Sequence, residues 1–344
     1  MDNILNLHNL ILQATRISIA VHTHPDGDAL GSGIGLTRFL TDTLGKDAML
    51  VLPDEVPPSL AFMLDEKTSG RVKVFSSGNG LAQQRISESD LIFVLDCNSP
   101  ARTASLEDSV RSAAVPKVLV DHHLSPETEV FDLVFSRTEI SSASEVLFWI
   151  LMELPEIKGD AKNLPAASAT ALMTGLTTDT NNFGNSVFPS TLKMASMLIE
   201  AGVDRDNILS ELYNRYRENR LRLMGYMLGD NMKITEEGVA YMILDKQTQE
   251  RFDFQQGESE GFVNLPLSID NVRMSILLTE ESDKFRVSVR SKKGVSANTF
   301  AKDWYNGGGH ELAAGGRLFF PGDIEAPEQA ETYILKSIGK FFND

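Results

Sequence analysis

Short apolar runs, each followed at once by polar or charged residues, recur through the first half of the chain. Runs at residues 17–21, 47–52, 90–95 and 116–120 predict β-strands, and the continuous run at 90–95 is typical of a strand covered on both faces. Residues 29–44 have apolar positions at helical spacing. Strands that alternate with helices in this way predict an α/β fold with a doubly wound, mainly parallel sheet.

The second half of the chain has a different pattern. Helical periodicity begins near residue 189, and strand-like runs return at 239–244, 272–278 and 285–289. In the last of these runs apolar residues alternate with Arg286 and Ser288, so one face of that strand is expected to be buried and the other polar. We therefore expect three parts, namely a domain over residues 1–190, a helical connector over 191–231 and a smaller C-terminal α/β domain over 232–344.

Acidic residues and histidines follow three of the predicted strands and one predicted helix. They are His22, Asp26 and Asp28, then Asp96, then Asp121, His122 and His123, and finally Asp179. Because the carboxyl ends of parallel strands share one edge of the sheet, we expect these side chains to converge. For any single aspartate the alternative is a helix cap or a turn residue. That alternative would have to hold at four separate places and would leave the paired histidines unexplained.

The chemistry of these side chains predicts a metal centre. Imidazole nitrogens and carboxylate oxygens together suit Mn²⁺, Zn²⁺ or Fe²⁺. Asp26 and Asp28 are two residues apart and point to one side of an extended segment, and His22 closes on the same ion if the chain turns at Pro25 and Gly27. Five carboxylates in one crevice would repel each other strongly without a metal.

A second candidate site is a glycine-rich segment near the end of the chain. Gly307, Gly308 and Gly309 precede His310, and a further glycine pair follows. Glycine lets the backbone approach an anion closely and direct N–H groups toward it. The alternative is a flexible hinge with an incidental histidine. We favour ligand binding because Arg290 and His310 border a compact fold rather than a low-complexity linker.

The composition narrows the choice of ligand. The chain of 344 residues has 48 acidic and 32 basic residues and a net charge of −16. Affinity for extended nucleic acid depends on Lys and Arg that neutralise phosphates. The balance therefore disfavours a binder of long duplexes and leaves short or small phosphate substrates open, with bound cations offsetting the charge.

Several observations bear on location. The single cysteine, Cys97, excludes an internal disulfide framework and fits a reducing compartment. The apolar runs are shorter than a membrane span, and the first residues lack the basic segment and the cleavage site of a signal peptide. We therefore expect a cytoplasmic protein without a membrane partner.

The motifs together resemble those of a known family. The segment from His22 to Asp28, Asp96, the run Asp121–His123 and Asp179 resemble the four motifs of the DHH phosphoesterase superfamily, and the glycine-histidine segment resembles its DHH-associated domain. The chain is most similar to the nanoRNase group, which hydrolyses short oligoribonucleotides and adenosine 3′,5′-bisphosphate. This resemblance implies a phosphoesterase that uses a water activated by two metals. The alternatives are a cyclic or linear dinucleotide phosphodiesterase, a polyphosphate or pyrophosphate hydrolase, and a non-catalytic nucleotide sensor.

The resemblance also implies roles for individual residues. The first metal would be bound by His22 and Asp26, the second by Asp28, His122 and Asp179, and Asp96 would bridge the two. Asp121 would support the site as a catalytic residue, and His123 would lie close to the scissile phosphate. The substrate phosphate would be held by Arg290, Ser291, Gly307, Gly308, Gly309 and His310.

The implied cofactors are two divalent cations, with Mn²⁺ expected first and Mg²⁺ or Co²⁺ as alternatives. The implied partners are short RNA or DNA oligonucleotides or small nucleotide phosphates, and a homodimer is an alternative to a monomer. One departure concerns the fourth motif. The family commonly has a glycine and then an aromatic residue followed by arginine after Asp179-Thr180, whereas this chain has the segment Asn181-Asn182-Phe183-Gly184. This departure bears on substrate preference rather than on the metal ligands.

Overall fold

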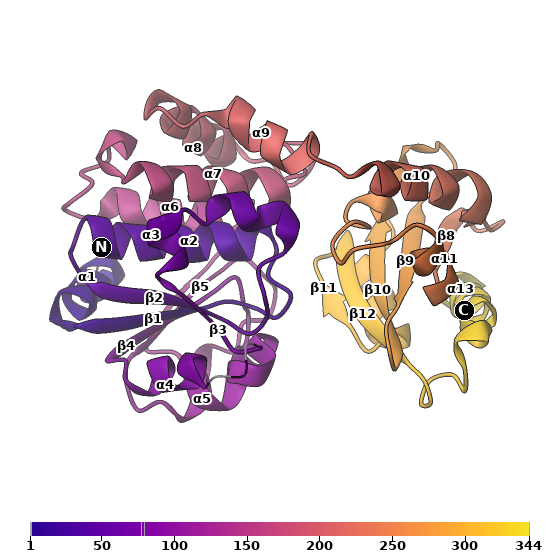
Figure 1. Ribbon diagram of the computed structural model, residues 1–344, viewed down its shortest axis with the longest axis horizontal. Coiled ribbons are helices and arrows are strands. Elements are labelled where there is room, and N and C mark those ends of the chain that lie inside the picture. Colours follow the sequence, from indigo (N-terminus) through magenta and orange to yellow (C-terminus); the bar gives the residue numbers. More distant parts are fainter. Residues whose placement is uncertain (1, 77, 79, 344) are drawn as a thin grey trace. The chain divides into compact units, whose positions relative to one another are not determined.

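The chain folds into two compact units. The computed structural model describes residues 2–76, 78 and 80–343 (Figure 1). The first unit extends to Arg215, and the second begins at Tyr216. The helical segment 191–231 falls on both sides of this boundary, because α8 (Pro189–Glu200) and α9 (Arg205–Tyr213) belong to the first unit and α10 (Glu218–Tyr226) belongs to the second.

The first unit is built on a six-stranded sheet in which every neighbouring pair of strands is parallel. Its strands are β1 (Arg16–Ala20), β2 (Asp47–Leu52), β3 (Val72–Val74), β4 (Leu91–Leu95), β5 (Lys117–Asp121) and β6 (Leu133–Ser136). The order β3-β2-β1-β4-β5-β6 confirms the doubly wound parallel sheet. The chain moves outward from β1 to β3 and then returns to β4 on the other side of β1. The sheet therefore has its switch point between β1 and β4, where ligands bind in such folds.

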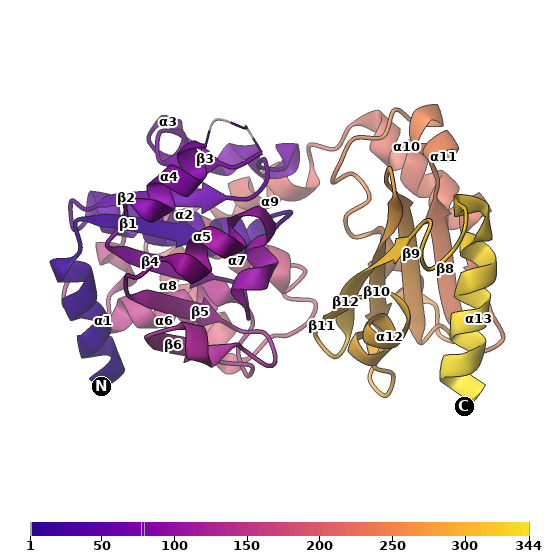
Figure 2. The same cartoon turned by 90° about the horizontal axis from the view of Figure 1, so that it is seen from below.

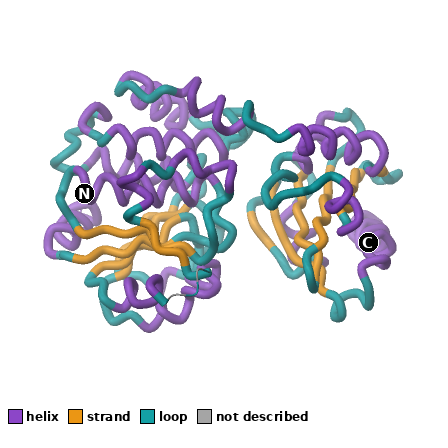
Figure 3. Tube along the Cα trace, in the orientation of Figure 1, coloured by secondary structure: helices purple, strands orange, loops and turns teal. Residues whose placement is uncertain are grey.

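Helices cover both faces of this sheet (Figure 3). They are α1 (Asp2–Gln13), α2 (Gly27–Asp42), α3 (Glu66–Ser69), α4 (Leu81–Ser87), α5 (Glu107–Ser112), α6 (Ala143–Glu153) and α7 (Ala166–Asp179), with α8 and α9. Short 3₁₀ segments occur at Pro58–Met63, Pro100–Leu106 (η2), Thr128–Val130 and Ala161–Asn163. The described residues of both units include no helix long and apolar enough to cross a bilayer.

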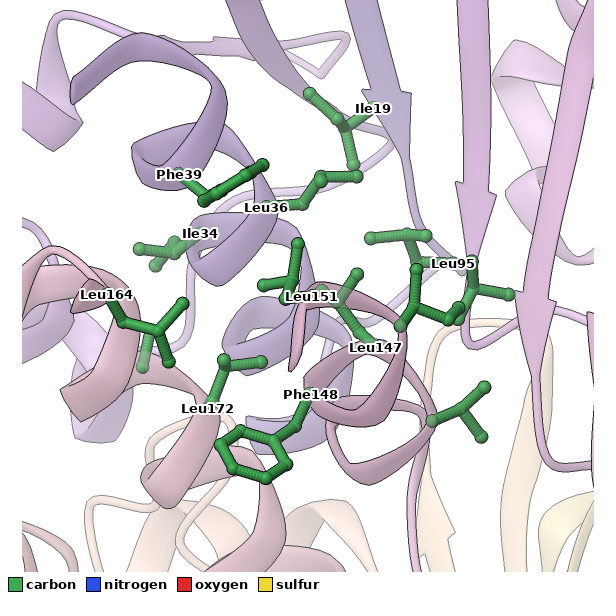
Figure 4. Packing of buried hydrophobic residues seen from close by; sticks show 14 of the residues in the cluster. Ile19, Ile34, Leu36, Phe39, Leu95, Leu147, Phe148, Leu151, Leu164 and Leu172 are labelled. Carbon is green, nitrogen blue, oxygen red and sulfur yellow. The ribbon is translucent and has the colours of Figure 1, made fainter. Parts of the chain in front are cut away.

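Alternation along β4 explains the two layers of helices. Phe93 and Leu95 belong to the larger apolar cluster, which includes residues of α2, α6 and α7 (Figure 4). Ile92 and Val94 belong to a separate cluster on α4 and α5. Successive side chains of a strand point to opposite faces, so a strand that is apolar at every position needs cover on both sides.

Close packing of α2 against α7 positions the polar segments. A Cβ added at Gly27 would overlap the side chain of Thr178, and one added at Gly31 would lie 2.7 Å from the carbonyl oxygen of Ala171. Glycine at these positions therefore lets the start of α2 lie against the end of α7. The last residue of α7 is Asp179, so this carboxylate belongs to the helix that the sequence predicted it to follow.

The second, smaller unit has a six-stranded mixed sheet with the strand order β11-β12-β10-β9-β8-β7 (Figure 2). Its strands are β7 (Lys233–Ile234), β8 (Val239–Leu244), β9 (Met274–Glu280), β10 (Lys284–Ser291), β11 (Gly308–Gly309) and β12 (Ala313–Phe319). Its helices are α10, α11 (Lys246–Arg251), α12 (Ala297–Trp304) and α13 (Ala330–Asn343), with a π-helical segment at Met227–Asn231 and 3₁₀ segments at Phe262–Ser268 and Pro327–Gln329. The β8–β9 pair is parallel and the other pairs are antiparallel.

Each face of the second sheet packs against a separate apolar cluster. Phe285, Val287 and Val289 of β10 pack into an apolar cluster with α12 and α13. On the other side, residues of β8 and β9 form a cluster with Leu223 of α10 and Phe262. The alternation predicted for β10 is confirmed, because its side chains are buried at every second position.

Candidate functional site

The predicted metal ligands come together at the switch point of the first sheet. His22 follows β1, Asp96 follows β4 and His122 follows β5. His22 Nε2 lies 3.3 Å from Asp96 Oδ2 and 3.6 Å from Asp26 Oδ1. His122 Nε2 lies 3.5 Å from Asp96 Oδ1, 3.8 Å from Asp28 Oδ2 and 3.6 Å from Asp179 Oδ2. All six candidates are therefore part of one cluster.

This cluster consists of two overlapping groups of donor atoms. His22, Asp26 and Asp96 form one group, and Asp28, Asp96 and His122 form the other, with the donor atoms of each group within 4.8 Å of one another. Asp96 belongs to both groups, so its two carboxylate oxygens face different histidines. Its backbone is in the left-handed region with φ of 55°, which is rare for a residue with a side chain. Such conformations persist where the surrounding structure enforces them, often at functional sites.

Two buried atoms test whether the cluster fits a cation. His22 Nε2 and Asp96 Oδ1 are buried and have no hydrogen-bond partner among the described residues. His22 Nδ1 lies 2.8 Å from the carbonyl oxygen of Thr23, which only accepts, so Nδ1 keeps a proton, and the ring that has lost its second proton has its lone pair on Nε2. A carbonyl oxygen that accepts from the other ring nitrogen of a ligating histidine fixes its tautomer in known metal sites. The donor set fits a metal ion.

The electrostatics of the cluster agree with this. Burial opposes the charged imidazolium, but Asp26 and Asp96 raise the pKa of His22 to about 10. Burial also opposes charge on His122, whereas Asp96, Asp179 and Asp28 raise its pKa to about 10. Burial and the nearby Asp96 raise the pKa of Asp28 to about 7. The carboxylates therefore favour the protonated forms of His22, His122 and Asp28, and a bound cation would replace those protons.

Asp28 is oriented by a helix far away in the sequence. The backbone N–H groups of Ala143 and Ser144, at the start of α6, donate to Asp28 Oδ2 and Oδ1 over 2.6 and 2.9 Å. Ser142 caps this helix by accepting from the N–H of Glu145. The positive end of a helix favours a carboxylate. No local pattern pointed to these donors, because they lie 115 or more residues from Asp28.

Asp26 combines two roles. Its Oδ1 accepts from the N–H groups of Asp28 and Ala29, so it is the N-cap of α2. The alternative of a helix cap therefore holds for this residue. The same oxygen faces His22, and the two roles are compatible because the two oxygens of a carboxylate together offer about four lone-pair sites.

Beside the cluster, Asp121 and His123 form a hydrogen-bonded pair. A third residue, Arg102, was not predicted and contacts His123. His123 Nδ1 lies 2.8 Å from Asp121 Oδ1, and His123 Nε2 lies 2.8 Å from a guanidinium nitrogen of Arg102. Arginine only donates, so in this state Nε2 accepts and the proton of the imidazole is on Nδ1. Arg102 belongs to η2, six residues after Asp96. Its position just beyond a strand end was the one sequence signal that it lies at this edge.

The predicted phosphate-binding residues of the second unit also come together. Arg290 near the end of β10 pairs with Ala313 of β12, and the N–H of His310 donates to the carbonyl oxygen of Ala313 over 2.8 Å. Ser291 is buried, and its hydroxyl donates to the carbonyl oxygen of Val295 over 2.7 Å. The Ser291 hydroxyl is therefore engaged inside the unit, in contrast to the expectation that it faces a ligand.

The glycine segment has a structural role. A Cβ at Gly307 would overlap the backbone of Gly315, and Gly309 has φ of 150°, so both positions require glycine. The N–H of Gly307 donates to Ala301, and that of Gly309 donates to the side chain of Asn298. As the segment stands, these two N–H groups do not point toward an anion, because the protein itself provides their acceptors.

Two domain families match this chain. Residues 16–176 match the DHH family, N-terminal domain, and residues 236–336 match the DHHA1 domain. The first match includes His22 to His123, and the second includes Arg290 and the glycine segment.

Relatives and a solved structure extend these matches over almost the whole chain. The bifunctional oligoribonuclease and PAP phosphatase NrnA of Thermus thermophilus is 30% identical over 314 residues, which are 88% of this chain and 84% of that protein. The protein of the same name from Bacillus subtilis is 29% identical over 304 residues, 87% of this chain and 88% of that protein. The crystal structure of an exopolyphosphatase-related protein from Bacteroides fragilis has a TM-score of 0.89 and 34% identity, covering 99% of this chain and 97% of that one.

Proposed function

This chain is a member of the DHH family, whose phosphoesterases are metal-dependent hydrolases, and from that premise we propose that it hydrolyses short oligoribonucleotides and adenosine 3′,5′-bisphosphate. The observation that supports this most is the pair of donor groups sharing Asp96, in which His22 Nε2 and Asp96 Oδ1 lack hydrogen-bond partners among the described residues. The substrate class is taken from the named relatives and from the acidity of the chain.

We assign the metal ligands as two sets. His22 and Asp26 would hold one divalent cation, Asp28, His122 and Asp179 would hold a second, and Asp96 would contact both. Mn²⁺ is the ion proposed for both positions, because mixed imidazole and carboxylate ligands suit it. When bound, such cations act as Lewis acids toward phosphoryl oxygens and lower the pKa of water to near neutrality.

The protein's own groups would orient the reaction. The α6 N–H groups fix Asp28, and Thr23 fixes the tautomer of His22, so both present lone pairs to the same space. Asp121 holds His123 with its proton on Nδ1. When Arg102 binds the substrate, His123 Nε2 would take a proton from the attacking water and deliver it to the leaving oxygen. Arg102 would hold a phosphoryl oxygen next to His123, since its guanidinium binds phosphate oxygens in a fixed geometry.

We assign the substrate's terminal phosphate to Arg290 and His310 of the second unit. A guanidinium and an imidazole near one strand end are suitable donors for a phosphate. The proposal also includes a cytoplasmic location, in keeping with the single, buried cysteine.

The test is product release with Mn²⁺ present. The substrates are a two-nucleotide RNA, adenosine 3′,5′-bisphosphate, pyrophosphate, a cyclic dinucleotide and a thirty-nucleotide RNA. Each is assayed with the intact protein, with Asp96→Asn and with Asp303→Asn as a control at an exposed carboxylate. We expect turnover of the first two substrates, a loss of about a thousandfold in Asp96→Asn and no change in the control.

Other outcomes would replace this proposal. Preference for pyrophosphate or for the cyclic dinucleotide would assign the chain to that activity. Comparable rates on the two RNA lengths would contradict the selectivity for short substrates. No turnover of any substrate by the metal-loaded protein would leave the nucleotide sensor as the better hypothesis.

A further inference from the structure

One face of the second sheet has a row of arginines, of which only Arg290 belongs to the site described above. On β10 the side chains that alternate with the buried Phe285, Val287 and Val289 are those of Arg286, Ser288 and Arg290. The paired strand β12 places Arg317 opposite Arg286, Gly315 opposite Ser288 and Ala313 opposite Arg290. Residues directly opposite on neighbouring strands share a face. This face therefore has an arginine pair at one end and Arg290 at the other.

The arginine pair is unfavourable for folding by itself. Like charges directly opposite each other in a sheet are destabilising. Arg317 is exposed, and its side chain has no ion pair or hydrogen bond among the described residues. The nearest acidic partner of Arg286 is Glu281, with 3.9 Å between Nε and Oε1, and Glu281 also lies 3.4 Å from Lys284. In a chain with a net charge of −16, two adjacent arginines with so little compensation indicate a binding site for an anion.

Only small residues lie between the two ends of this face. Ser288 and Gly315 are the residues there, and neither has a side chain larger than a hydroxymethyl group. Arg286 and Arg290 are four residues apart on one strand, which corresponds to about 13 Å. Adjacent phosphates of a nucleotide are joined through a single ribose and lie closer together than this. A nucleic acid ligand whose phosphates reach both ends would therefore be longer than a dinucleotide.

We propose that Arg286 and Arg317 form a second phosphate-binding site, which holds a backbone phosphate of a bound oligonucleotide a few nucleotides away from the phosphate held by Arg290. This inference rests on the proposed function, because it assumes that oligonucleotides are substrates and that Arg290 contacts one end. It explains how a strongly acidic protein retains affinity for strands of several nucleotides. Adenosine 3′,5′-bisphosphate and dinucleotides are too short to use this second site.

The test compares substrates of different length. We would measure kcat/KM for adenosine 3′,5′-bisphosphate, a two-nucleotide RNA and a five-nucleotide RNA with the full-length, Mn²⁺-loaded protein. The variant is Arg286→Gln/Arg317→Gln. The control, Lys162→Gln/Lys336→Gln, removes the same charge from two exposed lysines, of which Lys336 belongs to α13 on the opposite side of the sheet.

We expect the arginine variant to lose about tenfold or more in kcat/KM on the five-nucleotide RNA and to be unchanged on the two shorter substrates, because charge-assisted contacts are lost only with the longer strand. The slope of log kcat/KM against log salt for the five-nucleotide RNA should become shallower by about 0.7, since the variant loses one phosphate contact and each such contact to a single strand contributes about 0.7. The lysine control should keep the parent values. Arg317→Lys should retain most of the activity.

The controls separate the possible failures. Relief of the arginine repulsion means that the variant should unfold at the same or a higher temperature, so a loss of activity with retained stability assigns the effect to binding. An equal loss on all three substrates, or no loss on any, would overturn this inference while leaving the proposed function intact. A further measurement is binding of inorganic polyphosphate and of the five-nucleotide RNA to the parent protein and to the arginine variant. If the two arginines affect only polyphosphate binding, the face binds another polyanion, and this result would also overturn the inference. Failure of the parent protein on every RNA would instead reject the proposed function.

Discussion

At the scale of single residues, the carboxylates of the metal cluster raise the pKa values of their neighbours, so that several of these groups hold protons when no cation is bound. Four carboxylates converge on the switch point together with His22 and His122, and both imidazoles have a raised pKa because carboxylates surround them. The left-handed backbone of Asp96 directs one carboxylate toward both histidines. These features are unfavourable for an isolated fold and favourable for a cation site.

Metal uptake is predicted to release protons. The imidazoles of His22 and His122, with pKa values of about 10, and Asp28, with a pKa of about 7, must lose protons when they bind a cation. Affinity for Mn²⁺ should therefore rise by about tenfold per pH unit for each proton released, up to about pH 10. Calorimetry in buffers of different ionisation enthalpy counts these protons, and a pH-independent affinity would contradict the prediction.

The free energy of unfolding of the metal-free protein is expected to change with pH in the opposite direction to the affinity for Mn²⁺. A histidine whose pKa is raised on folding stabilises the folded state fully below its unfolded pKa of about 6.5, and that contribution is lost as the pH rises through about 10. The free energy of unfolding without metal should therefore fall over this window. Urea titrations with and without a chelator at several pH values would measure both trends.

Arg102 gives a second prediction at this scale. Arg102→Ala should lower kcat by about a hundredfold, the typical effect of removing one preorganised donor to a phosphoryl oxygen, and should leave the bound metal unchanged. Arg102→Lys should recover part of the loss. Arg16→Ala, at the opposite end of β1, is the control. Full activity of Arg102→Ala, measured together with its metal content, would exclude this role.

At the scale of elements, the contact between α2 and α7 decides whether the ligands meet. The first helix begins one residue after Asp26, and the second ends at Asp179. Their close approach depends on glycines, since a Cβ at Gly31 would lie 2.7 to 2.8 Å from backbone atoms of Ala171 and Gly175. Backbone atoms cannot move aside as a flexible side chain does, so a substitution there must separate the helices.

We predict that Gly31→Ala lowers the free energy of unfolding of the first unit by about 1–3 kcal/mol, because overpacking outweighs the better helix propensity of alanine. It should also weaken metal binding, since α2 provides Asp28. Gly339→Ala in α13 is the matched change, because nothing lies within 4 Å of the added Cβ, and it should stabilise the second unit by about 0.5–1 kcal/mol. Equal effects of the two substitutions on their units would refute the packing argument.

At the scale of the whole molecule, the chain divides its candidate ligands between two units. All six metal-ligand candidates precede Arg215, whereas Arg286, Arg290, His310 and Arg317 follow Tyr216. Each unit has its own apolar core. We therefore predict that a cation binds within the first unit and adds its binding energy to the stability of that unit.

Differential scanning calorimetry should show this division. Mn²⁺ at a hundred times its dissociation constant adds about 2.7 kcal/mol to the stability of the unit that binds it, which corresponds to a rise of about 5–10 °C in its transition. The transition of the other unit should not move. In Asp96→Asn neither transition should respond to Mn²⁺, and an equal shift of both transitions in the parent protein would contradict separate stabilisation.

The amino-acid sequence by itself determined the family, the α/β class and the identity of the converging side chains. Apolar runs of strand length with acidic residues directly after them are local patterns, and local patterns can be recognised without a structure. The comparisons confirm the family and the hydrolase activity. The boundaries of the three expected parts and the roles of the site residues stay predictions.

Only the tertiary structure decided which groups complete the site. Strand order places β1 beside β4, so that His22 and Asp96 face each other although 74 positions separate their numbers. The α6 amides reach Asp28 across 115 residues, and Arg102 reaches His123 from a different loop. The engagement of the Ser291 hydroxyl and the pairing of Arg286 with Arg317 likewise depend on register and packing. Contacts of this kind arise from chain segments that are distant in sequence, and no local pattern specifies them.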